Sequence, residues 1–509
     1  MKQTPRIFSL LFLIAAFQLP GISQVDSTAK SKAEKFITRH TVKIDNKIIN
    51  YTATVGTILL KNENDEPVAS IGYTAYIKDG ETDPARRPIS FSYNGGPGSS
   101  SMWLHMGIMG PRRVVVNDPF PNGPAPYKTE DNNSSVLDVT DVVMLDPVGT
   151  GISRAAGRGK NSDFWSVDGD IRSVSQAIRN FVHDNERWNS PKFLVGESYG
   201  TFRSAGVCDF LQSTYGISVN GVVLVSCVLD IRTLSFNPMD DISYVVNLPT
   251  YAATAWYHNK IANKPASLEN FLKEVRAFSS GDYASALQKG DQLSDAERDA
   301  VLNKLSAYTG ISKEYWNKAN LRVKQPQFAQ EVLRGSGSMV GRLDSRYTGI
   351  IKNLLAENAS NDPQSSDISP AFISAFMNYY TTELKVGKDK TYNVTASAFP
   401  DFKWDWKHAR SQGLFGEAVS PTSSPDLLNA MSNNPTMKIM VMNGIYDLAT
   451  PFGAAEYTFD HLGLTKKLKA NVSFKYYEAG HMMYVQPELA VKYKKDLADF
   501  INSSLKPAL

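Results

Sequence analysis

The feature that most constrains the fold is the stretch FLVGESYGTF at residues 193–202. An apolar run, Phe193-Leu194-Val195, is typical of a buried strand and leads directly into a turn with glycines two residues before and two residues after Ser198. Such glycines permit a sharp strand-to-helix turn that exposes the serine hydroxyl. The stretch therefore predicts a nucleophile at Ser198, with a structural glycine-serine turn as the alternative. The carboxylate of Glu197, directly before this serine, needs an explanation of its own.

Segments typical of strands alternate with helical segments around this turn. A strand-rich region at residues 41–78 is followed by runs typical of buried strands at 88–93, 141–145, 192–195 and 221–226. Two more such runs, 437–442 and 472–477, lie near the C-terminus, and helices are predicted at 171–184 and after Tyr199. This alternation predicts an α/β fold with a mostly parallel sheet and helices on both of its faces.

The pattern changes between residues 246 and 424. Strand-like runs disappear there, segments 267–278, 294–307 and 326–333 have helical patterns, and residues 358–369 are interpreted as a polar loop. A chain of 509 residues also exceeds the size of a single core. We therefore predict a core in two parts, residues 24–245 and 425–509, with residues 246–424 inserted as a helical cap.

The N-terminus has the pattern of a signal peptide. Lys2 and Arg6 precede an apolar run from Ile7 to Phe17, and small residues follow as far as Ser23. Residues 1–23 are therefore predicted to be removed on export to the periplasm or the exterior, with a short membrane anchor or a buried helix as the alternatives. No other segment has about 20 continuous apolar residues, so no stable membrane anchor is expected after signal removal.

Composition narrows the range of partners. The 54 Lys and Arg residues nearly balance the 51 Asp and Glu residues, so the net charge does not favour binding to nucleic acid. No Cys/His spacing typical of zinc is present, and neither a metal nor another cofactor is predicted. Cys208 and Cys227 are expected to be small buried side chains rather than a disulfide. The oligomeric state is left open.

Two further residues complete a catalytic pattern with Ser198. Asp447 follows the strand-like run 437–442, and His481 follows the run 472–477. Serine, then aspartate, then histidine, each on a turn after a strand, is the chain order of an α/β-hydrolase. His481 is predicted to accept the Ser198 proton, and Asp447 to hold the imidazole in the required tautomer.

An oxyanion hole needs two backbone donors directed at one point. The N–H of Tyr199, directly after the serine, is predicted to be the first. The second is expected from the glycine-rich loop Asn94–Ser100, where glycines allow close approach to a substrate carbonyl. A tight structural turn is the alternative interpretation of that loop.

Five blocks together resemble the serine carboxypeptidase family. They are NGGPGSSS, LDPVGTGIS, GESYGT, NGIYDLATPFG and AGHMMYVQP, spread in order over residues 94–487. The resemblance implies an α/β-hydrolase core with a helical cap, and removal of single residues from peptide C-termini without a metal. It assigns the triad to Ser198, Asp447 and His481, and the oxyanion donors to Gly96 and Tyr199.

The resemblance also explains Glu197. It implies that Asn94, Gly95 and Glu197 bind the terminal carboxylate of a peptide, and that Met482 lines the substrate site. Two facing carboxylates can share one proton in a strong hydrogen bond, which predicts loss of activity as pH rises.

The chain departs from the family pattern at three positions. Ser92 stands where the family has tryptophan, Ser99 where it has cysteine, and Ile108 where it has the acid that pairs with the Glu197 equivalent.

Three functions are consistent with these patterns. The leading one is an exported serine carboxypeptidase acting on peptides through an acyl-enzyme on Ser198. The second is an esterase or acyltransferase on the same scaffold, which the isoleucine at position 108 favours. The third is a non-catalytic binding protein. Four aromatic residues, left out of the predicted site, are possible pocket residues: Trp103, Tyr257, Tyr347 and Trp404.

Overall fold

The computed structural model describes residues 33–411 and 420–505. The predicted signal peptide, residues 1–23, lies outside these ranges. Within them, no helix has both the length and the apolar character required to cross a bilayer.

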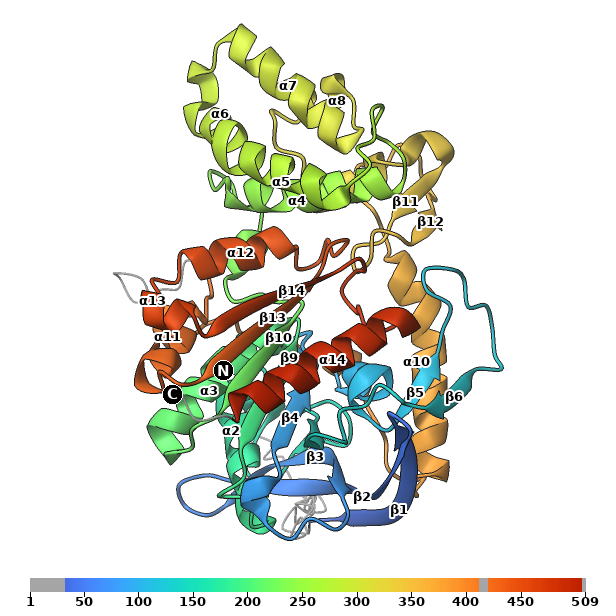
Figure 1. Ribbon diagram of the computed structural model, residues 1–509, viewed down its shortest axis with the longest axis vertical. Coiled ribbons are helices and arrows are strands. Elements are labelled where there is room, and N and C mark those ends of the chain that lie inside the picture. Colours follow the sequence, from blue (N-terminus) through green and yellow to red (C-terminus); the bar gives the residue numbers. More distant parts are fainter. Residues whose placement is uncertain (1–32, 412–419, 506–509) are drawn as a thin grey trace, which may run out of the picture.

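A mixed ten-stranded sheet organises the molecule (Figure 1). Its order is β1-β2-β3-β7-β4-β9-β10-β13-β14, and the short β8 pairs with β3. The first three strands form an antiparallel meander, whereas β7, β4, β9, β10, β13 and β14 run parallel to one another. The bounds are β1 Lys35–Ile44, β2 Lys47–Lys61, β3 Pro67–Lys78, β4 Ile89–Tyr93, β7 Asp141–Leu145, β8 Arg154–Ala155, β9 Lys192–Glu197, β10 Gly221–Val225, β13 Lys438–Gly444 and β14 Val472–Tyr477. The predicted fold class is confirmed.

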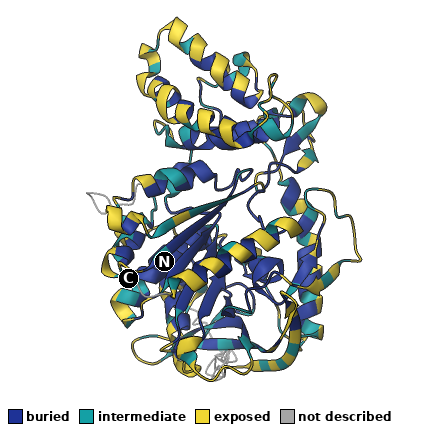
Figure 2. Ribbon diagram, viewed as in Figure 1, coloured by how far each residue is buried: buried dark blue, intermediate teal, exposed yellow. Residues whose placement is uncertain are grey.

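Helices cover both faces of this sheet because its parallel strands are apolar on both sides. In β9, Phe193 and Val195 belong to one apolar cluster and Leu194 to the other, as the alternation of a strand requires. The first cluster includes side chains of α10 (Pro363–Thr382) and α14 (Pro487–Ser504), and the second those of α2 (Val167–Asp184), α3 (Tyr199–Tyr215) and α11 (Ser424–Asn433). Figure 2 shows the central strands buried between them. Cys208 and Cys227 are both buried and unpaired, as predicted.

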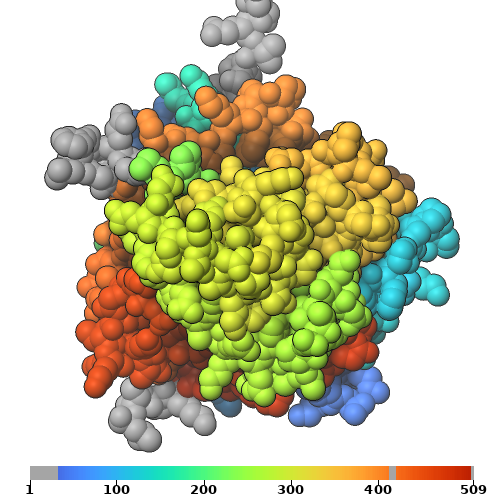
Figure 3. Space-filling model, turned by 90° about the horizontal axis from the view of Figure 1, so that it is seen from above, coloured from blue at the N-terminus to red at the C-terminus, as the bar shows by residue number. Residues whose placement is uncertain are grey.

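Six helices between β10 and β13 form a separate lobe beyond the carboxyl ends of the strands (Figure 1). They are α4 Ile242–Tyr257, α5 Leu268–Phe278, α6 Ala284–Lys289, α7 Asp295–Thr309, α8 Lys313–Lys318 and α9 Gln325–Glu331. They share an apolar cluster that includes Leu248, Val275, Leu305 and Trp316, and this cluster extends to Tyr446, Leu448 and Phe452 after β13. Seen from above, this lobe covers much of the face (Figure 3). The boundaries at 246 and 424 stay a prediction.

The interpretation of residues 358–369 as a polar loop is wrong in its second half. Helix α10 begins at Pro363, and the side chain of its N-cap residue, Asp362, accepts a hydrogen bond from the backbone N–H of Ser365. An aspartate before a proline at the first helical position is a standard helix start. The start of α10 was interpreted as a loop because its first turn contains a proline and polar residues.

The remaining elements are short. They are the hairpin β5 (Arg112–Val115) and β6 (Lys128–Asp131), the hairpin β11 (Ser338–Val340) and β12 (Thr348–Ile350), and the helices α1 (Met102–Leu104), α12 (Phe452–Asp460) and α13 (Lys466–Lys469). A π-helical turn, His105–Met109, follows α1.

Candidate active site

Ser198 occupies the sharp turn between β9 and α3. Its backbone has φ 60° and ψ −131°, a conformation that costs free energy in a residue other than glycine and that is concentrated at functional sites. A Cβ atom on Gly196 would lie 2.2 Å from the carbonyl oxygen of Gly200, so the crossing of strand and helix requires glycine there. Ser198 is half-buried and lines a cavity. The local sequence thus forms the predicted turn.

Asp447 and His481 lie at the same edge of the sheet as Ser198. They follow β13 and β14, which run parallel to β9 and β10, and the carboxyl ends of parallel strands meet at one edge. His481 Nδ1 donates to Asp447 Oδ2 over 2.8 Å. Burial disfavours the imidazolium, but the charge of Asp447 and its hydrogen bond outweigh this and raise the pKa of His481.

Asp447 is completely buried and accepts several hydrogen bonds besides that of His481. The backbone N–H groups of Ala449 and Thr450 donate to its Oδ1 over 2.8 and 3.0 Å, and the Thr450 hydroxyl donates to Oδ2 over 2.7 Å. These donors belong to the turn that carries Asp447, so the carboxylate is held in place by its own loop.

The loop between β11 and β12 holds the backbone of the histidine loop. The N–H of His481 donates to Leu343 O over 2.7 Å, and that of Gly480 donates to Asp344 Oδ2 over 2.9 Å. From the core side, Ser226 Oγ donates to His481 O over 2.6 Å. The position of the imidazole therefore depends on a segment inserted between the two halves of the sheet.

One cavity of about 260 Å³ gathers most of the predicted residues. Asn94, Gly95, Gly96, Glu197, Ser198, His481 and Met482 all line it. Asp447 lies behind His481 and does not line it, and the side chain of Tyr199 packs against Phe202 and Trp404 instead. Among the residues that the structure describes, no hydrogen bond joins the Ser198 hydroxyl to His481; such bonds are often long in the absence of substrate.

The glycine-rich loop lies directly against the serine turn. A Cβ atom on Gly95 would lie 2.4 Å from the backbone nitrogen of Tyr199, and Gly96 has φ +104°. Both positions therefore need glycine, one for close approach and the other for its conformation. The N–H groups of Gly96 and Tyr199 donate to no acceptor in residues 33–411 and 420–505. Both donors remain available to a substrate oxygen.

Glu197 is a buried acid, 3% exposed, at the wall of the cavity. Asn94 Nδ2 donates to its Oε1 over 2.9 Å, and the hydroxyl of Tyr484 donates to its Oε2 over 2.6 Å. Burial raises the pKa of Glu197 to about 7, although a charge on His481 and the two hydrogen bonds act in the opposite direction. Glu197 is therefore a group that titrates near neutral pH.

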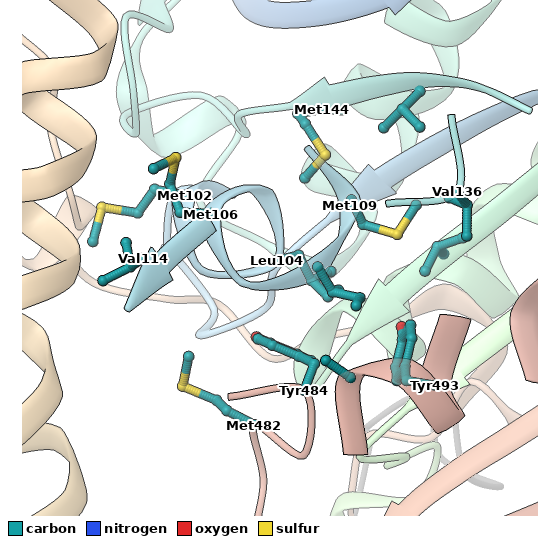
Figure 4. Close-up of a cluster of buried hydrophobic side chains, with 14 of the residues drawn as sticks. Met102, Leu104, Met106, Met109, Val114, Val136, Met144, Met482, Tyr484 and Tyr493 are labelled. Atoms are coloured by element: carbon teal, nitrogen blue, oxygen red, sulfur yellow. The ribbon is translucent and has the colours of Figure 1, made fainter. Parts of the chain in front are cut away.

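Ile108 offers this acid no polar partner. It is fully buried in the apolar cluster that also contains Met106 and Met109, and Figure 4 shows this cluster with Tyr484 and Met482 beside it. Glu197 is consequently the only acidic residue among the described residues that line the cavity.

Sequence reasoning missed several residues of the cavity wall. Arg342 and Leu343 come from the loop after β11, whereas Ser365, Ile368 and Ser369 come from the first turns of α10. The helix-start signal at Asp362-Pro363 could have identified the second group, but no local pattern indicates the first. Of the four aromatic residues considered, only Trp103 lines this cavity. Tyr257 lines another, of about 840 Å³.

Comparison with known structures supports the fold. A prohormone-processing carboxypeptidase, Kex1(Δ)p from Saccharomyces cerevisiae, superposes with a TM-score of 0.54 at 15% identity, over 89% of this chain and 92% of that one. A putative aryl esterase from Burkholderia cenocepacia matches at 12% identity over 88% of this chain and 99% of that one, with a TM-score of 0.35. The first likeness concerns the fold alone, and the second, with a TM-score below 0.5, supports no conclusion.

Sequence comparison is more specific. No curated protein sequence matches the chain. The family model described as serine carboxypeptidase, however, matches residues 73–494. That range begins in β3 and ends in α14, so it includes the whole parallel sheet, the inserted helices and every residue of the cavity wall. The chain belongs to the serine carboxypeptidase family.

Proposed function

We propose that this protein is an exported serine-type carboxypeptidase that releases C-terminal residues from peptides. One observation carries the proposal: the cavity lined by Ser198 and His481 is also lined by a largely buried acid, Glu197. Asn94 lies beside this acid and donates a hydrogen bond to it. A serine nucleophile alone fits any acyl hydrolase. A protonatable carboxyl next to the nucleophile adds a means to recognise the end of a peptide chain.

Acylation begins when Ser198 Oγ attacks the carbonyl carbon of the last peptide bond. His481 Nε2 takes the hydroxyl proton, and Asp447 stabilises the imidazolium through Nδ1. The tetrahedral oxyanion accepts hydrogen bonds from the N–H groups of Gly96 and Tyr199. The C–N bond then breaks, His481 returns the proton to the leaving amine, and the shortened peptide remains as an ester on Ser198.

Deacylation repeats these steps with water as the nucleophile. His481 accepts a proton from water as the oxygen attacks the ester carbonyl, and the same two N–H groups stabilise the second oxyanion. The bond to Ser198 Oγ breaks, and His481 returns the proton to that oxygen. The shortened peptide leaves with a new terminal carboxylate.

Recognition of the terminal carboxylate is assigned to Asn94, Gly95 and Glu197. The protonated Glu197 carboxyl donates a hydrogen bond to the substrate carboxylate, which an ionised carboxyl cannot do. Because the pKa of Glu197 is raised to about 7, the protonated form is available at mildly acidic pH. Met482 lines the same cavity, against the substrate.

The test is product analysis by mass spectrometry of a blocked peptide pool. Release of single C-terminal residues, abolished by Ser198→Ala, supports the proposal. Internal cleavage, or no cleavage of free-acid peptides, contradicts it. Failure of a fluorophosphonate to label Ser198 in folded protein would instead favour a non-catalytic binding protein.

An esterase or acyltransferase is the second candidate, because the buried, apolar Ile108 leaves Glu197 without a second acid. Three substrates with one acyl group separate the two functions: a free-acid peptide, its C-terminal amide and a simple ester. A carboxypeptidase prefers the free acid over the amide, whereas an esterase cleaves only the ester.

A further inference from the structure

Tyr484 connects the histidine loop to the acid beside the nucleophile. It is the third residue after His481, it is fully buried, and its hydroxyl donates to Glu197 Oε2 over 2.6 Å. Asn94 occupies the other oxygen of the same carboxyl group. The carboxyl of Glu197 is therefore held between donors from two separate loops.

Packing fixes the ring of Tyr484. A Cβ atom on Gly107 would lie 2.2 Å from its Cε2, so the ring lies directly on the backbone of the π-helical turn. On another side it meets Tyr493 of α14 edge to face, with ring centroids 6.0 Å apart (Figure 4). Because the ring cannot turn away, its hydroxyl stays directed at Glu197.

We propose that Tyr484 is a positioning residue that sets the orientation and protonation of Glu197, and thereby the preference of the site for free terminal carboxylates. This inference rests on the proposed function. The phenol gives Glu197 a hydrogen-bond partner beside the π-helical turn that carries Ile108. It differs from an acid in one respect: it stays neutral, since burial and the charge of Glu197 raise its own pKa well above the usual value.

The consequence for pH follows from the hydrogen bond. A phenol that donates to a carboxylate stabilises the ionised form and lowers its pKa. Besides Tyr484, the titratable groups that act on Glu197 are His481 and Asp447 from the triad loops. Tyr493 from α14 also faces this acid, but it stays neutral because burial and the charge of Glu197 raise its own pKa. Burial dominates all of them and holds the pKa near 7. The hydrogen bond from Tyr484 thus limits how far burial can raise the pKa of Glu197.

Tyr484→Phe removes the hydroxyl and keeps the ring. The readout is the ratio of kcat/KM for a free-acid peptide to kcat/KM for an ester without a carboxylate, because the titration of His481 cancels in that ratio. We expect the alkaline limb of the ratio to move up by about one pH unit, since the ionised Glu197 carboxyl loses a charge-assisted hydrogen bond. We also expect KM for the free-acid peptide to rise several-fold because the Glu197 carboxyl loses its fixed orientation.

Tyr493→Phe is the matched control. It removes a buried hydroxyl from the same cluster, and that hydroxyl has no hydrogen-bond partner among the described residues. Tyr493→Phe should leave the pH of the alkaline limb unchanged. A limb that stays in place in Tyr484→Phe, or that moves equally in both variants, overturns the proposal.

A direct titration separates this proposal from the proposed function. The infrared carbonyl band of protonated Glu197, assigned by its loss in Glu197→Gln, gives the protonation midpoint without any substrate. Tyr484→Phe should raise that midpoint, and Tyr493→Phe should not. An unmoved midpoint refutes the role of Tyr484 even if the enzyme cleaves peptides. A raised midpoint without cleavage of free-acid peptides refutes the proposed function instead.

Discussion

Two buried acids near His481 have contrasting surroundings. Asp447, behind the imidazole, accepts hydrogen bonds from two backbone N–H groups, a threonine hydroxyl and His481. Glu197, on the cavity side, receives one bond from an amide and one from a phenol. Four donors hold the carboxyl group of Asp447 in one orientation, whereas two neutral donors in a buried site leave the pKa of Glu197 raised to about 7. Under the proposed function, this difference separates a fixed partner of His481 from an acid that shares a proton with the substrate.

Location strengthens the same contrast. Asp447 is completely buried and reaches the cavity only through His481, while Glu197 forms part of the cavity wall. Asp447 can therefore act only on the imidazole of His481, whereas Glu197 can contact a substrate in the cavity. Four predictions, made with three substitutions, break or sharpen this comparison.

The largest effect is expected from Asp447→Asn. An asparagine at this position favours the wrong imidazole tautomer, so kcat should fall about 10³–10⁴-fold on every substrate, ester or peptide. A matched control exists in a second buried histidine pair, where His408 Nε2 bonds Asp426 Oδ2 over 2.9 Å. Asp426→Asn removes the same charge away from Ser198 and should leave kcat within about twofold. Similar losses in both variants would contradict the assignment of Asp447.

Glu197→Gln should change pH dependence rather than remove activity. In the wild-type protein, the free-acid to ester ratio of kcat/KM should fall about tenfold per pH unit above about 7, because only protonated Glu197 donates to a terminal carboxylate. A glutamine amide donates at every pH, so the ratio in the variant should be flat. Steady-state kinetics from about pH 5 to 9 measures both profiles. A flat wild-type profile would falsify the shared-proton mechanism.

The same substitution should stabilise the fold at alkaline pH. The pKa of Glu197 is raised from 4.5 to about 7 in the folded protein, so the wild-type chain loses stability as pH rises between these values. A glutamine side chain does not ionise, so the variant does not lose stability in this way. We expect the variant to be about 2–3 kcal/mol more stable at pH 9 and no more stable at pH 4, measured by urea unfolding. Glu478→Gln, a neutral replacement of an exposed acid in the loop after β14, should show no such trend.

The second histidine pair provides the smallest effect, with the opposite sign. Burial disfavours charge on His408, but the hydrogen bonds that its ring donates to Asp168 and Asp426 outweigh this and raise the pKa of His408 to about 9. This stabilisation is complete below the unfolded value of 6.5 and is lost as pH rises through about 9. His408→Gln should therefore cost about 1–2 kcal/mol at pH 6 and little at pH 10. An equal cost at both pH values would mean that packing, not charge, explains it.

Much of the fold could be predicted from local patterns. The parallel strands are short and apolar, the turn at Ser198 carries glycines where backbone atoms meet, and both kinds of signal lie within a few residues. Helix α10 was missed because its first turn is polar and its start was attributed to a loop. The catalytic and binding roles of the site residues stay predictions, although most of those residues line one cavity.

The sequence by itself determined the strand-to-helix turn, the chain order of Ser198, Asp447 and His481, and membership of the family, because each depends on short motifs and on their order along the chain. Only the tertiary structure decided what surrounds Glu197. Its hydrogen bonds come from Asn94 and Tyr484, which lie 103 and 287 residues away in the chain. The backbone of His481 likewise depends on Leu343 from the inserted segment. Burial and hydrogen bonding depend on which distant segments pack together, and no local pattern specifies that.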